Sequence, residues 1–135
     1  MLSTTVELRN IEGTEAALGW AGAHTVVVDR PDGKAGGRGP GFYGAQLLAL
    51  TIGGCFCNDL RYVAHAKGVA LGKIAVSVTL ELGGDPRLAI AATMVVSCDT
   101  LDDTSSADVI DEAKAISMAT NSLRKGVPVA VRSAA

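Results

Sequence analysis

The opening part of the chain contains a short segment, residues 3–9, in which apolar and polar residues alternate weakly. Alternation with a period of two is typical of strands that bury one face, so this segment predicts an edge strand. A second extended segment is expected at residues 15–20, and residues 25–29, TVVVD, predict a clearer strand because they are rich in β-branched residues. The sequence RPDG at residues 30–33 then predicts a turn, because proline presets φ and glycine permits a positive φ.

A long stretch without proline runs from Tyr43 to Lys67 and predicts the dominant helix of the chain. Apolar residues cover nearly every side of its first half, which indicates burial on all sides. After Asn58 the pattern becomes amphipathic, with His65 and Lys67 on the outward face. Gly68 follows the helix and is suited to end it in the left-handed conformation.

Two glycines, Gly53 and Gly54, interrupt the most apolar part of this helix. Each costs on the order of 1 kcal/mol of helix propensity relative to alanine. We therefore expect another segment of backbone to pack closely against the helix beside Cys55.

Two further alternating segments, residues 73–82 and 88–97, are separated by the turn sequence GGDP and predict a β-hairpin. The polar residues 102–106 have the character of a helix start, because Ser105 and Asp108 resemble a capping box. This helix is expected to run to about Lys125, to be ended by Gly126, and to be followed by a short strand at residues 127–131. Five of its residues are expected to face inward: Val109, Ile110, Ala113, Ile116 and Leu123.

The order of strands, helix, hairpin, helix and strand predicts an α+β fold built on an antiparallel sheet. A length of 135 residues fits one domain, residues 1–135. The glycine-rich residues 34–41, KAGGRGPG, lack the spacing and the Lys-Ser/Thr ending of a phosphate-binding loop. We interpret them as a mobile connection or as the rim of a pocket.

Charge and hydropathy narrow the classes of partner. The formal net charge is -2 and the basic residues are scattered, so a nucleic acid is not expected to bind. The most apolar window, residues 42–56, is too short to span a bilayer, and the N-terminal residues do not resemble a secretory signal. Three cysteines, not spaced as in a secreted disulfide framework, fit a reducing compartment. We therefore expect a soluble cytoplasmic protein with no membrane partner.

The cysteines are the first candidates for chemistry. Cys55 and Cys57 point to nearly opposite sides of a helix, so only one of them should face a given pocket. Asp59 lies one turn after Cys55 and would disfavour a thiolate there if it faced the same way. Periodicity alone therefore favours an inert structural cysteine. His24 and His65 are far apart in sequence, and neither a metal nor a bound cofactor is expected.

Longer stretches of the sequence resemble the OsmC/Ohr family of small thiol-dependent hydroperoxide-resistance proteins. The similarity begins with VVVDRPDG and the glycine-rich loop and continues into QLLALTIGGCFCNDLRYVAHAKGVAL, where the family has a helix with the pattern LLxAxxxC. KIAVSVTLEL is similar to the family's next strand, and AKAISMATNSLRKGVPV is similar to its second long helix and last strand. The similar segments follow the family's order and spacing from Thr25 onward.

This resemblance implies an intertwined homodimer, in which antiparallel sheets wrap two long helices and each active site lies at the dimer interface. It aligns Cys55 with the family's peroxidatic cysteine, whose thiolate attacks the O–O bond of a hydroperoxide and becomes a sulfenic acid. In the family's cycle a second cysteine then forms a disulfide, and an external thiol reduces it. An Arg and a Glu activate the thiolate and position the substrate.

Several of the family's partner residues are missing from this chain. The position of the resolving cysteine holds Ser117, which cannot form a disulfide. The position of the Glu holds Ala45, followed by Gln46. Arg9 is a candidate for the Arg. We therefore take Cys55 as the candidate catalytic residue and Gln46 and Ser117 as candidate pocket residues.

Three functions are compatible with these residues. The first is a thiol-dependent hydroperoxide reductase that uses Cys55 with an external thiol. The second is a family member that binds a small apolar or electrophilic molecule at the dimer-interface pocket without peroxide turnover. The third is a redox-sensing module in which Cys55 or Cys57 is modified and the dimer changes shape.

Overall fold

The computed structural model describes residues 1–102 and 104–134. The chain divides into two compact units, Met1–Leu48 and Ala49–Ala135. Each unit is described by itself, and the expectation of a single domain stays a prediction. The fold is α+β with antiparallel sheets, as the sequence predicts.

The first unit holds a three-stranded antiparallel sheet in the order β1-β2-β3. Its strands are β1 (Glu7–Asn10), β2 (Ala17–Ala21) and β3 (His24–Val28), close to the predicted segments. Gly19 in the central strand pairs with Leu8 on one side and Val26 on the other. A Cβ added at Gly19 would lie 3.3 Å from the Leu8 side chain, so the glycine lets these side chains pack over the sheet.

The glycine-rich segment returns to this sheet at its end. Phe42 forms an isolated parallel bridge with Val28. The Phe42 N–H donates to the Val27 carbonyl at 2.9 Å, and the Asp29 N–H donates to the Phe42 carbonyl at 3.0 Å. These two bonds fix both ends of the loop beside the end of β3.

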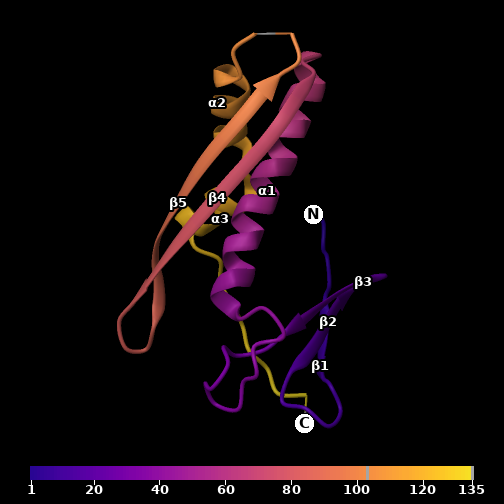
Figure 1. The fold of residues 1–135 in the computed structure, drawn as a ribbon, viewed down its shortest axis with the longest axis vertical. Helices are drawn as coiled ribbons and strands as arrows, with labels where there is room; N and C mark the ends of the chain where they lie inside the picture. The colour runs from indigo at the N-terminus through magenta and orange to yellow at the C-terminus, as the bar shows by residue number, and fades with distance from the viewer. Residues whose placement is uncertain (103, 135) are drawn as a thin grey trace. The chain divides into compact units, whose positions relative to one another are not determined.

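The predicted long helix is present as α1 (Gly44–Lys67), which has 24 residues (Figure 1). Gly68 follows it with a φ of 71°, in the left-handed region where glycine carries no steric cost. Both the span of the helix and its predicted glycine stop are confirmed.

The expectation that α1 is buried on all sides is wrong for the chain by itself. Ile52, Phe56 and Leu60 are buried, but Leu50 is 54% exposed and Tyr62 is 68% exposed. One side of the helix packs against its own unit, and the opposite side is uncovered. Because the uncovered side also carries apolar residues, the sequence of the helix looks apolar on every side.

The predicted hairpin is confirmed in the second unit as β4 (Leu71–Gly83) and β5 (Leu88–Thr100). Figure 1 shows its two long strands running alongside α1. A Cβ added at Gly53 would lie 3.0 Å from Cγ2 of Val78 on β4, whereas a Cβ at Gly54 would meet nothing. The close approach predicted for the glycine pair therefore holds for Gly53, with a side chain as the neighbour, and is wrong for Gly54.

The second predicted helix is interrupted. It forms as α2 (Ala107–Ile116) and α3 (Met118–Lys125), separated by Ser117, whose ψ of 112° is not helical. Ile116 is the last residue of α2 and is 52% exposed, and Leu123, which lies beyond the break, is 48% exposed. Both were expected to face inward, and those two assignments are wrong. Val109 and Ala113 are buried as predicted, and Ile110 is half-buried.

The start of α2 differs from the predicted capping box. Ser106 is the N-cap residue and makes no side-chain cap hydrogen bond, and the Ser105 hydroxyl accepts from the Ala107 N–H at 3.1 Å. The polar segment 102–106 includes residue 103, which lies outside the described residues. Gly126 ends α3 with a φ of 82°, as predicted.

The predicted last strand at residues 127–131 is not formed, because no strand pairs with it in the described chain. Its valines are exposed instead, at 60% for Val127, 81% for Val129 and 93% for Val131. An isolated strand has no ladder to satisfy its backbone, so alternation alone does not make this segment a strand.

The core of the second unit lies where α1, the hairpin and α2 meet. The buried residues that form it are Phe56, Leu60, Val63, Ala64, Leu71, Cys98, Val109 and Ala113. Leu60 of α1 and Ala113 of α2 are both fully buried in this cluster, which lies next to the Cys55–Asp59 turn of α1.

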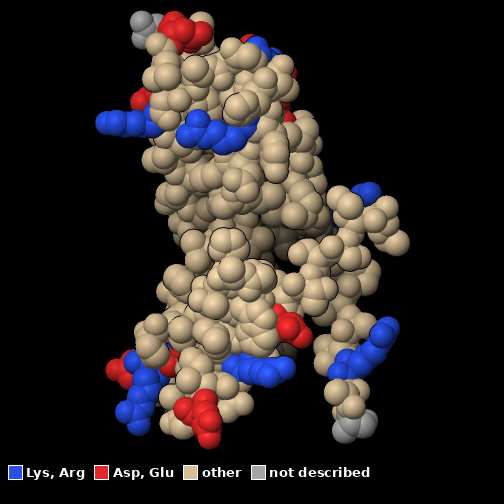
Figure 2. Space-filling model, turned by 90° about the vertical axis from the view of Figure 1, so that its right-hand side faces the viewer, with Lys and Arg blue, Asp and Glu red and all other residues tan. Residues whose placement is uncertain are grey.

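On the face displayed in Figure 2, Lys and Arg side chains stand in small groups interspersed with Asp and Glu. The scattering of basic residues in the sequence is thus visible on this face. Among the described residues, none of the helices combines the length and hydropathy needed to cross a membrane.

Candidate functional site

Cys55 lies in the middle of α1 and is partly exposed. Its thiol donates a hydrogen bond to Oδ2 of Asp59, with 3.7 Å between Sγ and the oxygen. Asp59 is one helical turn further on, at the spacing that brings two side chains together on a helix. The structure therefore answers the question left by the sequence: the Asp59 carboxylate faces Cys55.

The Asp59 carboxylate has few partners for a buried acid. Asp59 is only 5% exposed. Within the described residues, the bond from Cys55 is the one hydrogen bond that this carboxylate accepts, and it belongs to no ion pair. A thiol is a weak donor, so most of the hydrogen-bond acceptor capacity of this carboxylate is unused. Sequence reasoning noted Asp59 only as an obstacle to a thiolate.

The other two cysteines occupy different environments. Cys57 is partly exposed on α1, two residues from Cys55 and therefore on another side of the helix. Cys98 is buried in the core of the second unit. Burial raises the pKa of the Cys98 thiol, Asp99 raises it further, and Arg61 opposes this. Cys98 is therefore a structural residue with little thiolate character.

Ser117, a candidate pocket residue from the sequence, is fully buried at the break between α2 and α3. Its hydroxyl donates to the Thr120 hydroxyl at 3.4 Å, and its carbonyl accepts from the Asn121 N–H at 3.0 Å. Both bonds shape the start of α3. In the structure, the contacts of Ser117 are with residues at the start of α3.

Gln46, the second candidate pocket residue, lies in the first turn of α1 and is exposed. Its side-chain carbonyl accepts a hydrogen bond from the Tyr43 N–H at 3.2 Å. This is the reciprocal half of a capping box, which satisfies a backbone donor ahead of the helix. The structure gives Gln46 a capping role, and Ala45 beside it supplies no carboxylate.

Arg9 and His24 belong to the first unit and His65 to the second, and each is described within its own unit. The guanidinium of Arg9 lies over the Trp20 ring, 5.6 Å from its centroid, within the first unit. His24 is exposed at the start of β3, and His65 is exposed near the end of α1, as expected for a solvated side chain. In the part of the chain that the structure describes, no group of His, Cys, Asp and Glu has the arrangement of a metal site.

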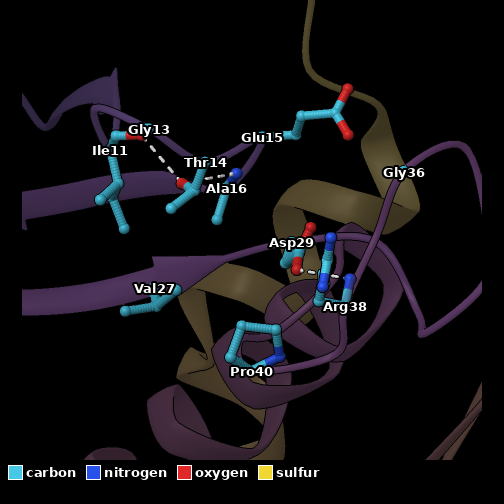
Figure 3. A pocket seen from close by; sticks show the side chains of 10 residues that line it. All are labelled: Ile11, Gly13, Thr14, Glu15, Ala16, Val27, Asp29, Gly36, Arg38 and Pro40. Carbon is cyan, nitrogen blue, oxygen red and sulfur yellow. Dashed lines mark hydrogen bonds between the residues drawn. The ribbon is translucent and has the colours of Figure 1, made fainter.

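The first unit contains an open cavity of about 830 Å³ between the β1–β2 turn and the glycine-rich loop. Figure 3 shows the loop residues Gly36, Arg38 and Pro40 on one side and Thr14 and Ala16 on the other. The interpretation of the glycine-rich segment as the rim of a pocket is confirmed.

Asp29 holds this loop in place, a role that the sequence did not reveal. Its carboxylate accepts the backbone N–H of Arg30 at 2.8 Å and that of Arg38 at 3.0 Å, and it pairs with the Arg30 guanidinium at 3.2 Å. The Arg38 N–H is the largest cause that lowers the pKa of the Asp29 carboxyl, and burial opposes it. Its position directly after a strand and before RPDG was the signal that could have found it.

A second open cavity of about 410 Å³ lies at the end of α1. It is lined by Arg61, His65 and Gly68 together with the start of β4. Neither of these two cavities is lined by Cys55.

The fold has relatives among solved structures. An OsmC-like protein of unknown function from Vibrio cholerae superposes with a TM-score of 0.77 at 8% identity, over 90% of this chain and 94% of that chain. An OsmC-like protein from Mycoplasma pneumoniae gives 0.75 at 17% identity, over 91% and 88%. An organic hydroperoxide resistance protein from Legionella pneumophila gives 0.64 at 16% identity, over 92% and 90%. At these identities the likeness shows the fold.

No curated protein sequence matches this chain. Residues 36–132 match the sequence profile of the family described as OsmC-like protein. The matched range contains residues 36–41 of the glycine-rich loop, α1 with Cys55 and Asp59, the hairpin, α2 and α3. The resemblance inferred from the sequence is thereby confirmed: the chain belongs to the OsmC-like protein family.

Proposed function

We propose that this protein reduces organic hydroperoxides, with Cys55 as the reacting thiol and an external thiol as the reductant. The observation that carries the proposal is the environment of Cys55: a partly exposed thiol on the central helix of an OsmC-like fold, in contact with a buried carboxylate. Cys57 lacks such a contact in the described chain, and Cys98 is buried in the core.

The reaction proceeds in two stages. The Cys55 sulfur attacks the O–O bond, an S–O bond forms, and the hydroperoxide leaves as an alcohol, so that the cysteine is oxidised to sulfenic acid. An external thiol then condenses with the sulfenic acid to a mixed disulfide and water, and a second external thiol releases Cys55. This cycle needs no resolving cysteine, which accords with Ser117 at that position.

The proposal extends to a homodimer. The uncovered side of α1, with Leu50 and Tyr62, and the exposed valines of residues 127–131 are apolar surfaces that a second copy could cover. The free cysteines of the chain fit the reducing conditions of the cytoplasm. Light scattering should then give twice the mass of the 13.7 kDa chain.

Consumption of cumene hydroperoxide in the presence of dithiothreitol tests the function. We expect wild-type protein to consume the peroxide, Cys55→Ser to abolish consumption, and Cys57→Ser to retain it. Cys57 is the matched control because it lies two residues away on the same helix and is also partly exposed. No turnover by wild-type protein would refute the proposal.

A second candidate function is binding of a small apolar molecule without turnover. The cavity of the first unit favours it, because its volume suits a small ligand and Ile11, Ala16 and Val27 contribute to its lining. Saturable binding of an apolar fluorescent probe, unaffected by Cys55→Ser in a protein that consumes no peroxide, would support this candidate over the first.

A further inference from the structure

We propose that Asp59 is the proton carrier of the Cys55 reaction, accepting the thiol proton as sulfur attacks and delivering it to the departing alkoxide. The inference rests on the proposed function and adds a catalytic residue to it. It starts from the one hydrogen bond that Asp59 accepts within the described residues, from the thiol of Cys55 at 3.7 Å.

Asp59 is buried, whereas the other described charged residues of its unit are exposed. Asp59 is 5% exposed, and the apolar side chains of Phe56, Leu60 and Val63 are buried on the same helix. Apart from Asp59, the charged side chains of α1 are exposed. The charged side chains of the elements packed on α1, namely β4, β5 and α2, are exposed too. These exposed residues are Arg61, His65 and Lys67 on α1, Lys73 and Glu81 on β4, Asp99 on β5, and Asp108, Asp111, Glu112 and Lys114 on α2. Lys67 is paired with Glu112 at 2.8 Å and Lys114 with Asp111 at 3.8 Å. Asp59 is thus the buried acid in contact with the reacting sulfur.

The chemistry requires a proton to move twice. A neutral thiol must lose its proton to become a strong nucleophile, and an alkoxide is a poor leaving group unless it gains one. A carboxylate that touches the sulfur can serve both steps. The S–H bond breaks as the proton passes to Asp59, the S–O bond forms as the O–O bond breaks, and the carboxylic acid then protonates the alkoxide.

This route keeps the charge of the site constant. The pair carries one negative charge as thiol and carboxylate, and the same charge as thiolate and carboxylic acid. Moving charge within the pair avoids creating a second anion beside Asp59, which the buried carboxylate would oppose. At the end of the step Asp59 is again a carboxylate, the sulfur is a sulfenic acid, and the peroxide is an alcohol.

Ala45, at the start of α1, has no carboxylate that could carry the proton. The first turn of α1 carries no acidic residue. Asp59 supplies a carboxylate from one turn beyond the cysteine on the same helix. The spacing of four residues on α1 brings the two side chains to the same side of one helix.

The test compares Asp59→Asn with wild type by following single-turnover oxidation of Cys55 with peptide-resolved mass spectrometry. Asparagine keeps the shape of the side chain but cannot carry the proton. We expect oxidation by cumene hydroperoxide to slow about 100-fold, within the range of general acid–base effects. Oxidation by peracetic acid and alkylation of Cys55 by iodoacetamide still require loss of the thiol proton, but acetate and iodide leave without gaining one. Both reactions should therefore slow less than oxidation by cumene hydroperoxide does.

Two further variants complete the test. Asp59→Glu restores a carboxyl group and should recover part of the hydroperoxide rate, whereas Asp99→Asn, at an exposed site on β5, should react as wild type does. Thermal unfolding followed by circular dichroism shows that each variant is folded.

The possible results separate the inference from the function on which it rests. If wild-type Cys55 is inert to hydroperoxide, both fail. If wild type reacts and Asp59→Asn reacts equally fast, only the proton-carrier role is refuted. If Asp59→Asn reacts faster with every reagent, Asp59 acts solely as an opposing charge and the role is likewise refuted. Equal slowing with all three reagents would mean that Asp59 delivers no proton to the leaving group, which would overturn the proton-carrier role as well.

Discussion

Asp29 in the first unit and Asp59 in the second have the same exposure, 5%, but their carboxylates meet different partners. Asp29 accepts two backbone N–H groups and pairs with the Arg30 guanidinium. Asp59 accepts a single thiol. A carboxylate filled by fixed donors holds the backbone in one conformation, whereas a carboxylate with one weak donor keeps unused acceptor positions. The exposed fraction is the same for both aspartates, so it is the hydrogen-bond donors around each carboxylate that distinguish a structural role from a chemical one.

The largest expected effect tests the packing that buries Asp59. Leu60 is fully buried beside it in the core, so Leu60→Ala should lower the free energy of unfolding by about 2–5 kcal/mol. Leu50→Ala, on the uncovered side of the same helix, should change it by about 0.5 kcal/mol or less in the monomer. Urea denaturation at a protein concentration where light scattering gives the monomer mass measures both. Equal losses would contradict the division of α1 into a packed and an open side.

The second prediction concerns the structural aspartate. Asp29→Asn should lower the urea midpoint, because an amide cannot accept the backbone N–H groups of Arg30 and Arg38 as well as a carboxylate does. The decrease should be smaller than that caused by Leu60→Ala. Asp32→Asn, at an exposed position in the neighbouring turn, is the control. A midpoint unchanged by Asp29→Asn would show that the loop does not depend on this carboxylate.

The pH dependence sharpens the same prediction. The pKa of Asp29 is lowered in the folded chain, so its contribution is fully present above the unfolded value of about 3.9 and is lost as pH falls through the folded pKa. The stability difference between wild type and Asp29→Asn should therefore be constant above about pH 4 and shrink below it. Denaturation series at several pH values measure this, and a difference that grows on acidification would contradict the assignment.

The two glycines before Cys55 give a matched pair with a smaller effect. Gly54→Ala should stabilise the chain by up to about 1 kcal/mol, because the added methyl group meets nothing and helix propensity improves. Gly53→Ala should gain less or lose stability, because its Cβ would lie 3.0 Å from Val78. Thermal unfolding measures both. If alanine is equally favourable at both positions, the close approach of β4 to α1 is not as the structure has it.

The last stability prediction concerns Asp59 itself, for which a small change is expected. Asp59→Asn removes a weak hydrogen bond from a thiol and leaves a neutral amide, so the free energy of unfolding should change by less than about 1 kcal/mol. A much larger loss would place Asp59 with Asp29 as a structural residue.

The sequence predicted the parts of the fold that depend on local pattern. The extent of α1, its glycine stop and the long hairpin follow from periodicity and turn residues, and all three are confirmed. The break at Ser117 and the missing strand at residues 127–131 depend on what packs around them, which periodicity does not contain.

The site was predicted in part for the same reason. The family resemblance selected Cys55, and helical spacing placed Asp59 within reach of it. The burial of Asp59, which leaves the thiol as its partner, comes from the packing of α1 against its unit. The roles of Gln46 as a helix cap and of Asp29 as a loop anchor depend on side-chain geometry that spacing does not reveal.

The central claim is that Cys55 is the thiol that reacts with hydroperoxides. The most direct test treats reduced wild-type protein with one equivalent of cumene hydroperoxide, traps sulfenic acid with dimedone, and measures adducts by peptide-resolved mass spectrometry. The account predicts that Cys55 is modified first, with Cys57 slower and the buried Cys98 slowest. Modification of Cys57 before Cys55, or no sulfenic acid at Cys55, would contradict it.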